Sequence, residues 1–486
     1  MRKEFISCFI LLSFFQISLV WGKVVVAGMF SDNMVMQQKT NAPIWGKAKI
    51  NTTVKLNTSW DGKTYTTKAD KEGKWKIIVR TPVAGGPYKI SITDGEKISL
   101  NNVLIGEVWI CSGQSNMEMP LKGFGASGQI EGAVDAILKA NESTPIRFYS
   151  NDFDENGWTH QYSKKTLDDC KGQWYTNSSA NVASASATAW FFAKYLQEAL
   201  NVPVGVMIAS WGGSNITAWM SEETVKPFGV DVSHLAEEVD LSQKAKHKIA
   251  CMLYNAKIAP LIGVAMKGYI WYQGEENKNA PDMYEKLFPA MVKDYRTKWG
   301  IGDFPFYFAE LAPFNYDDPN KITVAKFREM QLRLINAVPN TGIALTTDIG
   351  DPNTIHPGNK YEVGRRLALW ALAKDYGKTN IGYITPVYKS MDIDKNKIFI
   401  NFEFTIKNGL NPLQTQLSSF EIAGEDKIFY PAKAIIDIKT RKLSVWNDSI
   451  QKPVAVRYAF KNYAEASLFD YYGLPVAAFR TDNWEK

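Results

Sequence analysis

Apolar and polar positions follow two different periods along this 486-residue chain. Between residues 23 and 100 they alternate with a period of two in short runs, for example at 53–57 and 75–80. Turn-forming pairs such as Asp61-Gly62 and Asp94-Gly95 separate the runs. Because a period of two places every second side chain on one face of a strand, this region is predicted to be a small β-sandwich.

Strands and helical stretches alternate over residues 101–384. Apolar runs predict strands at 204–210, 268–272, 306–311 and 342–347, and amphipathic stretches predict helices at 185–200 and 360–373. This alternation predicts an α/β domain with a parallel sheet and helices on both faces. Strand-like runs return at 397–402, 434–438, 442–446 and 453–458, so residues 385–486 are predicted to form a C-terminal β-domain.

The first 22 residues have the pattern of a secretory signal peptide. Arg2 and Lys3 precede an apolar core from Phe5 to Val20, and Gly22 offers a small residue for cleavage. The 16-residue core is shorter than the ~20 residues that a membrane-spanning helix needs. We therefore expect a periplasmic, outer-surface or secreted protein with no integral membrane segment after signal cleavage.

Charge and cysteine usage exclude some classes of protein. The formal net charge is only +6, and charges of both signs are interspersed, so nucleic acid is not an expected partner. After the leader, Cys111, Cys170 and Cys251 remain, without the spacing of metal ligands, and no metal site is predicted. Whether Cys170 and Cys251 pair is left open.

A candidate nucleophile follows the strand predicted at 103–111. This strand leads into Ser112-Gly113-Gln114-Ser115-Asn116, a small polar step that predicts a tight turn with Ser115 at the carboxyl end of the strand. Such a turn exposes a hydroxyl, and the helix that follows offers unpaired N–H groups to a developing oxyanion. The alternative is an ordinary turn in which Ser115 only caps the helix.

A serine nucleophile needs a base, and the chain contains four histidines. His160, His234 and His247 lie in polar segments without neighbours that suggest a site. His356 follows a predicted strand end, in a loop just before the helix at 360–373. We take His356 as the candidate general base; the alternative is a residue that only bonds the backbone near the start of that helix.

Several blocks of the sequence together resemble a known family. Besides Gly113-Gln114-Ser115-Asn116-Met117, they are residues 30–37, 204–213, 271–277 and 348–357. In this order they are similar to the SGNH-type carbohydrate esterases, and specifically to the sialate O-acetylesterase family. The resemblance implies an SGNH-hydrolase-like (flavodoxin-like) parallel sheet sandwiched by helices, with accessory β-sandwich domains. It also implies a serine esterase that needs no cofactor.

The resemblance assigns Ser115 as nucleophile and His356 as general base, but leaves the third member of the triad open. SGNH enzymes usually carry the acid in an Asp-x-x-His arrangement, whereas Asn353 stands at that position here. Asp351 and Asp348 remain as candidates, and Asp351 is slightly preferred because a short loop could fold it onto the imidazole. A Ser–His dyad oriented by a backbone carbonyl is the alternative.

The oxyanion would need two or three fixed donors. The N–H groups of Ser115 and Gly213 are candidates, and Gln273 or Asn277 could add a side-chain amide; the family pattern favours Gln273. Glu275 is expected to order this loop rather than to act as an acid.

Three tryptophans that flank the blocks are candidates for stacking on a sugar ring, and the alternative is that they belong to the core. They are Trp211, Trp219 and Trp271.

Taken together, the sequence predicts a secreted esterase that removes O-acetyl groups from a carbohydrate, foremost O-acetylated sialic acid. One alternative is the same reaction on acetylated xylan or another polysaccharide. The other is a carbohydrate-binding protein without activity, for which Asn353 is the only support.

Overall fold

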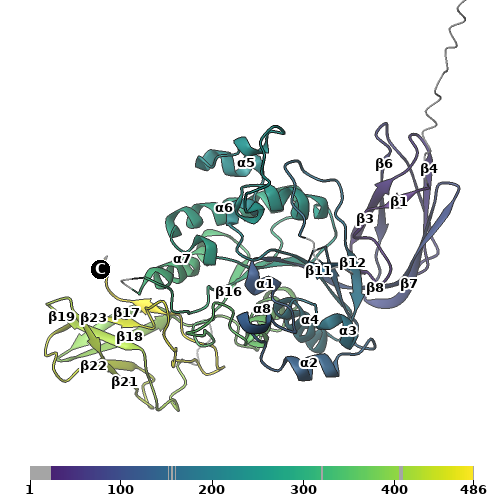
Figure 1. Ribbon diagram of the computed structural model, residues 1–486. Helices are drawn as coiled ribbons and strands as arrows, with labels where there is room; N and C mark the ends of the chain where they lie inside the picture. The colour runs from purple at the N-terminus through teal and green to yellow at the C-terminus, as the bar shows by residue number, and fades with distance from the viewer. Residues whose placement is uncertain are drawn as a thin grey trace, which may run out of the picture.

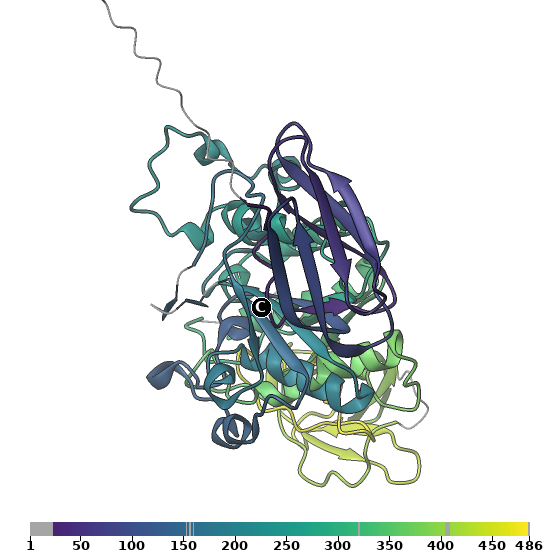
Figure 2. The same cartoon turned by 90° about the vertical axis from the view of Figure 1, so that its right-hand side faces the viewer.

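A computed structural model describes residues 23–484, apart from residues 152, 155–156, 159, 319–320 and 404–408. The leader predicted over residues 1–22 lies outside the described residues. A central α/β domain carries one β-domain at each end (Figure 1), and Figure 2 shows the strands of the N-terminal domain facing the viewer. None of the helices in the described part of the chain is long and apolar enough to cross a membrane.

The N-terminal domain consists of two packed groups of strands. One is the sheet β1(Val25–Val26)-β3(Asn41–Lys47)-β6(Lys74–Arg80). The other contains β2(Val35–Gln37), β4(Thr53–Thr58), β5(Thr64–Lys68), β7(Gly85–Thr93) and the first part of β8(Lys97–Gly113). Strands β4 and β6 alternate strictly between exposed and buried residues, which confirms the predicted β-sandwich.

Strand β8 belongs to both the N-terminal and the central domain. Its first part pairs with β7, and its second part, from Glu107 to Gly113, pairs with β13(Val204–Ser210) and β14(Gly268–Tyr272). The boundary predicted between residues 100 and 101 therefore falls inside one continuous 17-residue strand. The N-terminal domain is therefore continuous with the strand that leads into Ser115.

The central sheet has the strand order β12-β9-β13-β8-β14-β15-β16. Its remaining strands are β9(Ile146–Ser150), β12(Gln173–Thr176), β15(Phe306–Ala309) and β16(Thr341–Ala344). All neighbours are parallel except β12, which is antiparallel to β9. The strands β13-β8-β14-β15-β16 follow the flavodoxin-like order, in which ligands bind at the carboxyl ends of the strands where the strand order reverses, here between β8 and β14.

Helices cover both faces of the central sheet, as predicted. Helices α4(Ala187–Leu200) and α8(Lys360–Asp375) share a core with one face, and α6(Pro281–Trp299) and α7(Thr323–Ala337) share a core with the other. The shorter elements are α1(Ser115–Glu118), α2(Ala133–Lys139), α3(Ser179–Val182), α5(Glu222–Val225), β10(Phe153–Asp154) and β11(Gly157–Trp158).

The C-terminal domain has two four-stranded sheets and its own core. They are β17(Val387–Asp394)-β18(Lys397–Glu403)-β22(Leu443–Trp446)-β21(Lys433–Ile436) and β20(Phe429–Pro431)-β19(Phe420–Gly424)-β23(Pro453–Tyr458)-β24(Phe479–Arg480). The domain is fixed to α7 by two hydrogen bonds of 2.9 Å from Arg480 to Glu329. The buried Arg328 also donates to the carbonyl of Ala459 at 3.3 Å.

Candidate active site

Ser115 lies at the turn between β8 and α1, at the centre of the parallel sheet. Gly113 has φ +143°, and a Cβ atom at this position would lie 2.1 Å from the carbonyl oxygen of Tyr272, so only glycine fits. The N–H of Gln114 donates to the same carbonyl at 2.9 Å. Ser115 is the first residue of α1, so its own N–H has no acceptor within the helix. The turn therefore has the geometry expected of a nucleophile elbow.

A loop before α8 brings His356 to this turn. The side chain of Asn116, next to Ser115, donates to the carbonyl of Ile355 at 3.0 Å, which ties the two segments together. His356 Nδ1 lies 3.2 Å from the carbonyl oxygen of Ser127. Since a carbonyl only accepts, Nδ1 carries the proton and Nε2 carries the lone pair. Nε2 is buried, and within the described ranges it has no hydrogen-bond partner.

The environment of His356 favours the neutral imidazole that a general base needs. Burial lowers its pKa below the ordinary 6.5, the Ser127 carbonyl opposes this shift, and the charge of Lys360 adds to it. The ring of Phe124 meets the imidazole edge to face at a centroid distance of 5.2 Å, and this contact limits its rotation.

Neither predicted acid contacts the imidazole. Both carboxylate oxygens of Asp348 accept from Arg366, at 2.7 and 2.6 Å. Asp351 accepts the N–H of Asn353 at 2.7 Å and so closes a turn within its own loop. The expectation that Asp351 folds onto His356 is therefore not met. The Ser127 carbonyl holds Nδ1 instead, as the dyad alternative requires.

The turn after β13 lies beside Ser115, the candidate nucleophile. A Cβ atom at Gly212 would lie 3.3 Å from Ser115 Cβ. The Gly212 N–H donates to Glu118 Oε2 at 2.7 Å, so this donor is already used. Gly213 has φ +65°, and in the described part of the chain its N–H has no acceptor. The N–H groups of Ser115 and Gly213 remain available to an oxyanion.

The two amide side chains near this turn differ in what they can donate. Gln273 uses both hydrogens of its amide, donating to the Ser214 carbonyl at 2.9 Å and to Asn277 Oδ1 at 2.7 Å. Asn277 Oδ1 also accepts the N–H of Ile216 at 3.0 Å, which fixes the orientation of this amide. Within the described residues no acceptor pairs with Asn277 Nδ2. Asn277, and not Gln273 as the family pattern favours, therefore has a side-chain amide that can donate to an oxyanion.

A buried network lies beneath the nucleophile turn. Asn116 donates to Glu275 Oε1 at 2.5 Å and accepts from Lys360 Nζ at 2.5 Å. Burial raises the pKa of Glu275 and lowers the pKa of Lys360 to about 7. Glu275 thus links its loop to the residue after Ser115, which fits the ordering role expected from the sequence.

A second charged cluster, which the sequence does not reveal, lies behind the Gly212 turn. Glu118 Oε1 lies 3.2 Å from His160 Nε2, while Lys257 Nζ donates to the Ser210 carbonyl at 3.2 Å. Burial raises the pKa of Glu118 and lowers that of Lys257 to about 7. Glu118 stands three residues after Ser115, a helical spacing that could have singled it out. No signal in the sequence links His160 to it.

Of the three candidate tryptophans, two belong to the core. Trp219 and Trp271 are at most 1% exposed and pack edge to face at 5.9 Å. Their indole N–H groups are used by Ser214 and Tyr284, so neither ring can stack on a sugar.

Trp211 is half-buried and lies beside the Gly212 turn. His160 stacks on it at 4.3 Å, and His247 lies 5.5 Å from its ring. The structure thus brings together two histidines that the sequence did not connect with the site.

The described residues contain no group of three His, Cys, Asp or Glu side chains that could hold a metal ion. The three cysteines of the described chain are buried free thiols, so Cys170 and Cys251 are not paired.

A family model for "Carbohydrate esterase, sialic acid-specific acetylesterase" matches residues 105–372, more than half of the chain. The chain belongs to this family. It is therefore a carbohydrate acetylesterase, an ester hydrolase. The matched region holds Ser115, the Gly212–Gly213 turn and His356, and it leaves out most of both β-domains.

Whole-chain relatives agree with this carbohydrate acetylesterase assignment. A solved carbohydrate acetylesterase from Xanthomonas citri is 33% identical, covers 95% of this chain and 100% of its own, and superposes with a TM-score of 0.82. The human sialate O-acetylesterase is 27% identical over 467 residues, covering 90% of this chain and 87% of its own. The mouse sialate O-acetylesterase is 26% identical over 437 residues, with 77% and 78% covered.

Proposed function

We propose that this carbohydrate acetylesterase hydrolyses O-acetyl esters of sialic acid through an acetyl-enzyme on Ser115. The observation that supports the mechanism is the buried Nε2 of His356, which has no hydrogen-bond partner among the described residues, while the Ser127 carbonyl holds Nδ1 on the opposite side of the ring. Such a nitrogen can accept the proton of a serine hydroxyl that attacks an ester carbonyl.

The reaction then follows from the donors around Ser115. His356 Nε2 takes the Ser115 proton as Oγ bonds to the acetyl carbon, and the carbonyl oxygen becomes an oxyanion. The N–H groups of Ser115 and Gly213 and the Nδ2 of Asn277 stabilise it. When the C–O bond to the sugar breaks, His356 returns the proton to the sugar oxygen. Water, deprotonated by His356, attacks the acetyl-enzyme and releases acetate and free Ser115.

Positive charge beside the turn supports an acidic sugar. The segment that carries Lys244, Lys246 and Lys248 lies at the turn after β13, where a Cβ atom at Gly213 would be 3.4 Å from Nε2 of His247. Burial and Lys248 lower the pKa of His247, so the positive charge comes from the lysines. Lys248 is paired with Glu276 at 2.7 Å, whereas Lys246 donates to the Ser242 carbonyl at 2.8 Å and lies over the Tyr162 ring, 5.7 Å from its centre. The carboxylate of sialic acid would be attracted to such a segment, and neutral xylan would not. The names of the mammalian relatives support the same sugar.

We also infer that the protein is exported, because residues 1–22 have the charge and apolar pattern of a signal peptide. Sequencing the amino terminus of the protein recovered from the cell exterior or periplasm tests this inference. A mature chain that begins near Lys23 is expected, and one that retains Met1 would contradict it.

The test of the function is acetate release from O-acetylated sialic acid and from acetylated xylan, measured in parallel. We expect turnover of the sialic acid ester, and its loss in Ser115→Ala and in His356→Ala. Activity on xylan alone would keep the mechanism and overturn the substrate. No activity on either would favour a carbohydrate-binding protein.

A further inference from the structure

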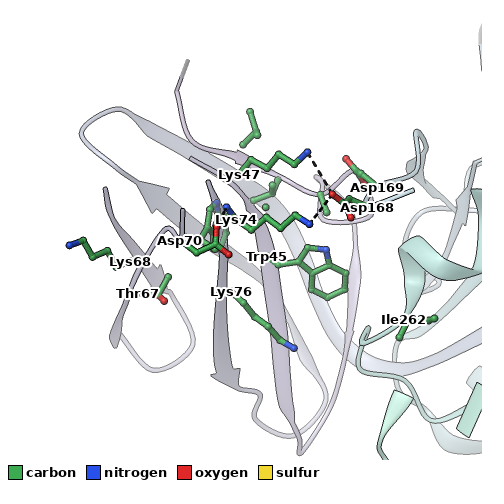
Figure 3. Close-up of a pocket in the computed structure, with 15 residues that line it drawn as sticks. Trp45, Lys47, Thr67, Lys68, Asp70, Lys74, Lys76, Asp168, Asp169 and Ile262 are labelled. Atoms are coloured by element: carbon green, nitrogen blue, oxygen red, sulfur yellow. Dashed lines mark hydrogen bonds and ion pairs between the residues drawn. The ribbon is translucent and has the colours of Figure 1, made fainter. Parts of the chain in front are cut away.

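A cavity of about 550 Å³ lies on the N-terminal domain, and none of the active-site residues lines it. One wall is the outward face of the β1-β3-β6 sheet. The other comes from the central domain, from Asp168, Asp169 and Ile262 (Figure 3). A cavity of this size between two domains falls within the range that small-ligand sites occupy, roughly 300–1,000 Å³.

The sheet wall presents an aromatic ring where polar residues are expected. On β6, Trp75, Ile77 and Val79 are buried, so Lys74 and Lys76 point outward. Trp45 of β3 pairs with Lys76 and therefore shares the outward face. Figure 3 shows the Trp45 ring between the side chains of Lys74 and Lys76.

The ring is fixed and only partly covered. Phe30 packs against Trp45 edge to face at 4.7 Å, and Trp45 remains half-buried. The core of the domain therefore holds the indole, while part of its surface borders the cavity. A rigid indole that borders a cavity is the kind of platform on which sugar rings stack.

The charges around the ring leave an excess of ammonium groups. Asp168 is paired with Lys74 at 3.1 Å and lies 4.0 Å from Lys47. Lys68 and Lys76 have no carboxylate partner in the part of the chain that the structure describes.

The other two acidic groups of the cavity are already engaged. Asp70 accepts the N–H groups of Glu72 at 2.8 Å and Lys74 at 2.9 Å. Asp169 accepts those of Gly28 at 2.7 Å and Cys170 at 2.8 Å. These hydrogen bonds fix both carboxylates but leave them charged, so the four lysines that line the cavity exceed its three carboxylates by one charge.

We propose that this cavity is a second glycan-binding site, which takes an acidic sugar unit of the chain whose esters are cleaved at Ser115. The sugar ring stacks on Trp45, and its carboxylate is bound by Lys76. Lys74, held in place by Asp168, donates to a hydroxyl group. Holding one unit of a glycan here raises the effective concentration of its acetyl esters at the active site. The proposal rests on the proposed function only in requiring an acidic glycan as substrate.

The test measures binding without turnover. Ser115→Ala protein is titrated by calorimetry with an unacetylated oligosialic acid and with a neutral xylo-oligosaccharide of equal length. In the Ser115→Ala protein, the further change Trp45→Ala is expected to weaken binding of the acidic oligomer about tenfold, because the stacking contact is lost. Lys76→Glu is expected to abolish binding of the acidic oligomer. Trp60→Ala is the matched control, because Trp60 is a half-buried tryptophan of the same domain that lies outside the cavity and donates to the Arg80 carbonyl.

A second readout uses protein with Ser115 intact. Trp45→Ala should lower kcat/KM on an acetylated sialic acid polymer and leave turnover of a small activated acetyl ester unchanged. Thermal unfolding checks that each variant folds. Unchanged affinity in Trp45→Ala and Lys76→Glu, or equal binding of the neutral oligomer at this cavity, would overturn the proposal. Turnover of the small ester reports on Ser115 separately, so a failure of the active-site account is recognised independently.

Discussion

Glu118 offers the sharpest test of how the oxyanion site is built. It is 7% exposed, and its Oε2 accepts the Gly212 N–H at 2.7 Å. That contact fixes the turn that carries Gly213, whose N–H is a proposed oxyanion donor. Glu118→Ala removes the acceptor, whereas Glu118→Gln keeps an oxygen at the same position and removes only the charge.

The expected size of the effect follows from these contacts. A buried N–H left without an acceptor costs about 1–3 kcal/mol, enough to let the turn move. Loss of one oxyanion donor costs roughly 2.7–4 kcal/mol, or about 10²–10³ in kcat. We therefore expect Glu118→Ala to lower kcat about 100-fold with little change in KM, since the donor acts in the transition state. Glu118→Gln should lose less than about tenfold, because its amide oxygen still accepts the bond.

Lys257 limits the cost to stability. Its pKa of about 7 already includes the attraction of Glu118. Without that charge the pKa of Lys257 falls further, so the buried amine is neutral at pH 7.

The assay is steady-state acetate release, with thermal unfolding measured on the same samples. Full kcat in a folded Glu118→Ala protein would refute this reasoning. Equal losses in the alanine and glutamine variants would show that the charge, and not the acceptor, matters.

Other predictions address the base, the acids and the tryptophans. Burial lowers the pKa of His356 below 6.5, so the imidazole becomes protonated only at a lower pH. The acid limb of the pH profile of kcat/KM should therefore have its midpoint below pH 6.5. A midpoint at or above pH 6.5 would argue against a buried His356 as the base. Asp348→Asn should lower the unfolding free energy by roughly 1.5–3 kcal/mol, because Arg366 loses its bidentate carboxylate and keeps only Glu362 at 3.3 Å and the Leu345 carbonyl at 2.7 Å. Asp351→Asn should leave both stability and kcat near wild type, and a selective loss of kcat in this variant would restore Asp351 as the acid. Trp219→Ala should lose about 3–5 kcal/mol of unfolding free energy in denaturant titrations, because it empties a buried site. Trp211→Ala should raise KM and leave stability unchanged. Loss of stability without a change in KM in Trp211→Ala would exclude Trp211 as a sugar contact.

The fold could be predicted well wherever a segment is buried on both faces. The strands predicted at 204–210, 268–272 and 453–458 have the same bounds in the structure. In the first two, a mostly apolar run ends just before a glycine-containing turn, at Trp211-Gly212 and at Gln273-Gly274. The boundary near residue 100 could not be predicted. Strand β8 changes partners there without a break, and the local sequence does not reveal which strands pair with it.

In the candidate active site, too, features set by the local sequence could be predicted, and features set by partners distant in the sequence could not. The positions of Ser115 and His356 follow from local turns, which motifs encode. The roles of Asp348 and Gln273 depend on distant partners, Arg366 and the Ser214 carbonyl, that no spacing predicts.

The sequence also could not separate the three tryptophans, because each stands next to one of the family's sequence blocks. The structure separates them by burial: Trp219 and Trp271 are in the core, and Trp211 is half-buried.

The most direct test of the central claim is covalent labelling by a fluorophosphonate, followed by mass spectrometry of the digested protein. The account predicts a single modified peptide, labelled on Ser115, and no labelling in Ser115→Ala or after protection by O-acetylated sialic acid. Modification of a different serine, or none in a protein that releases acetate, would contradict it.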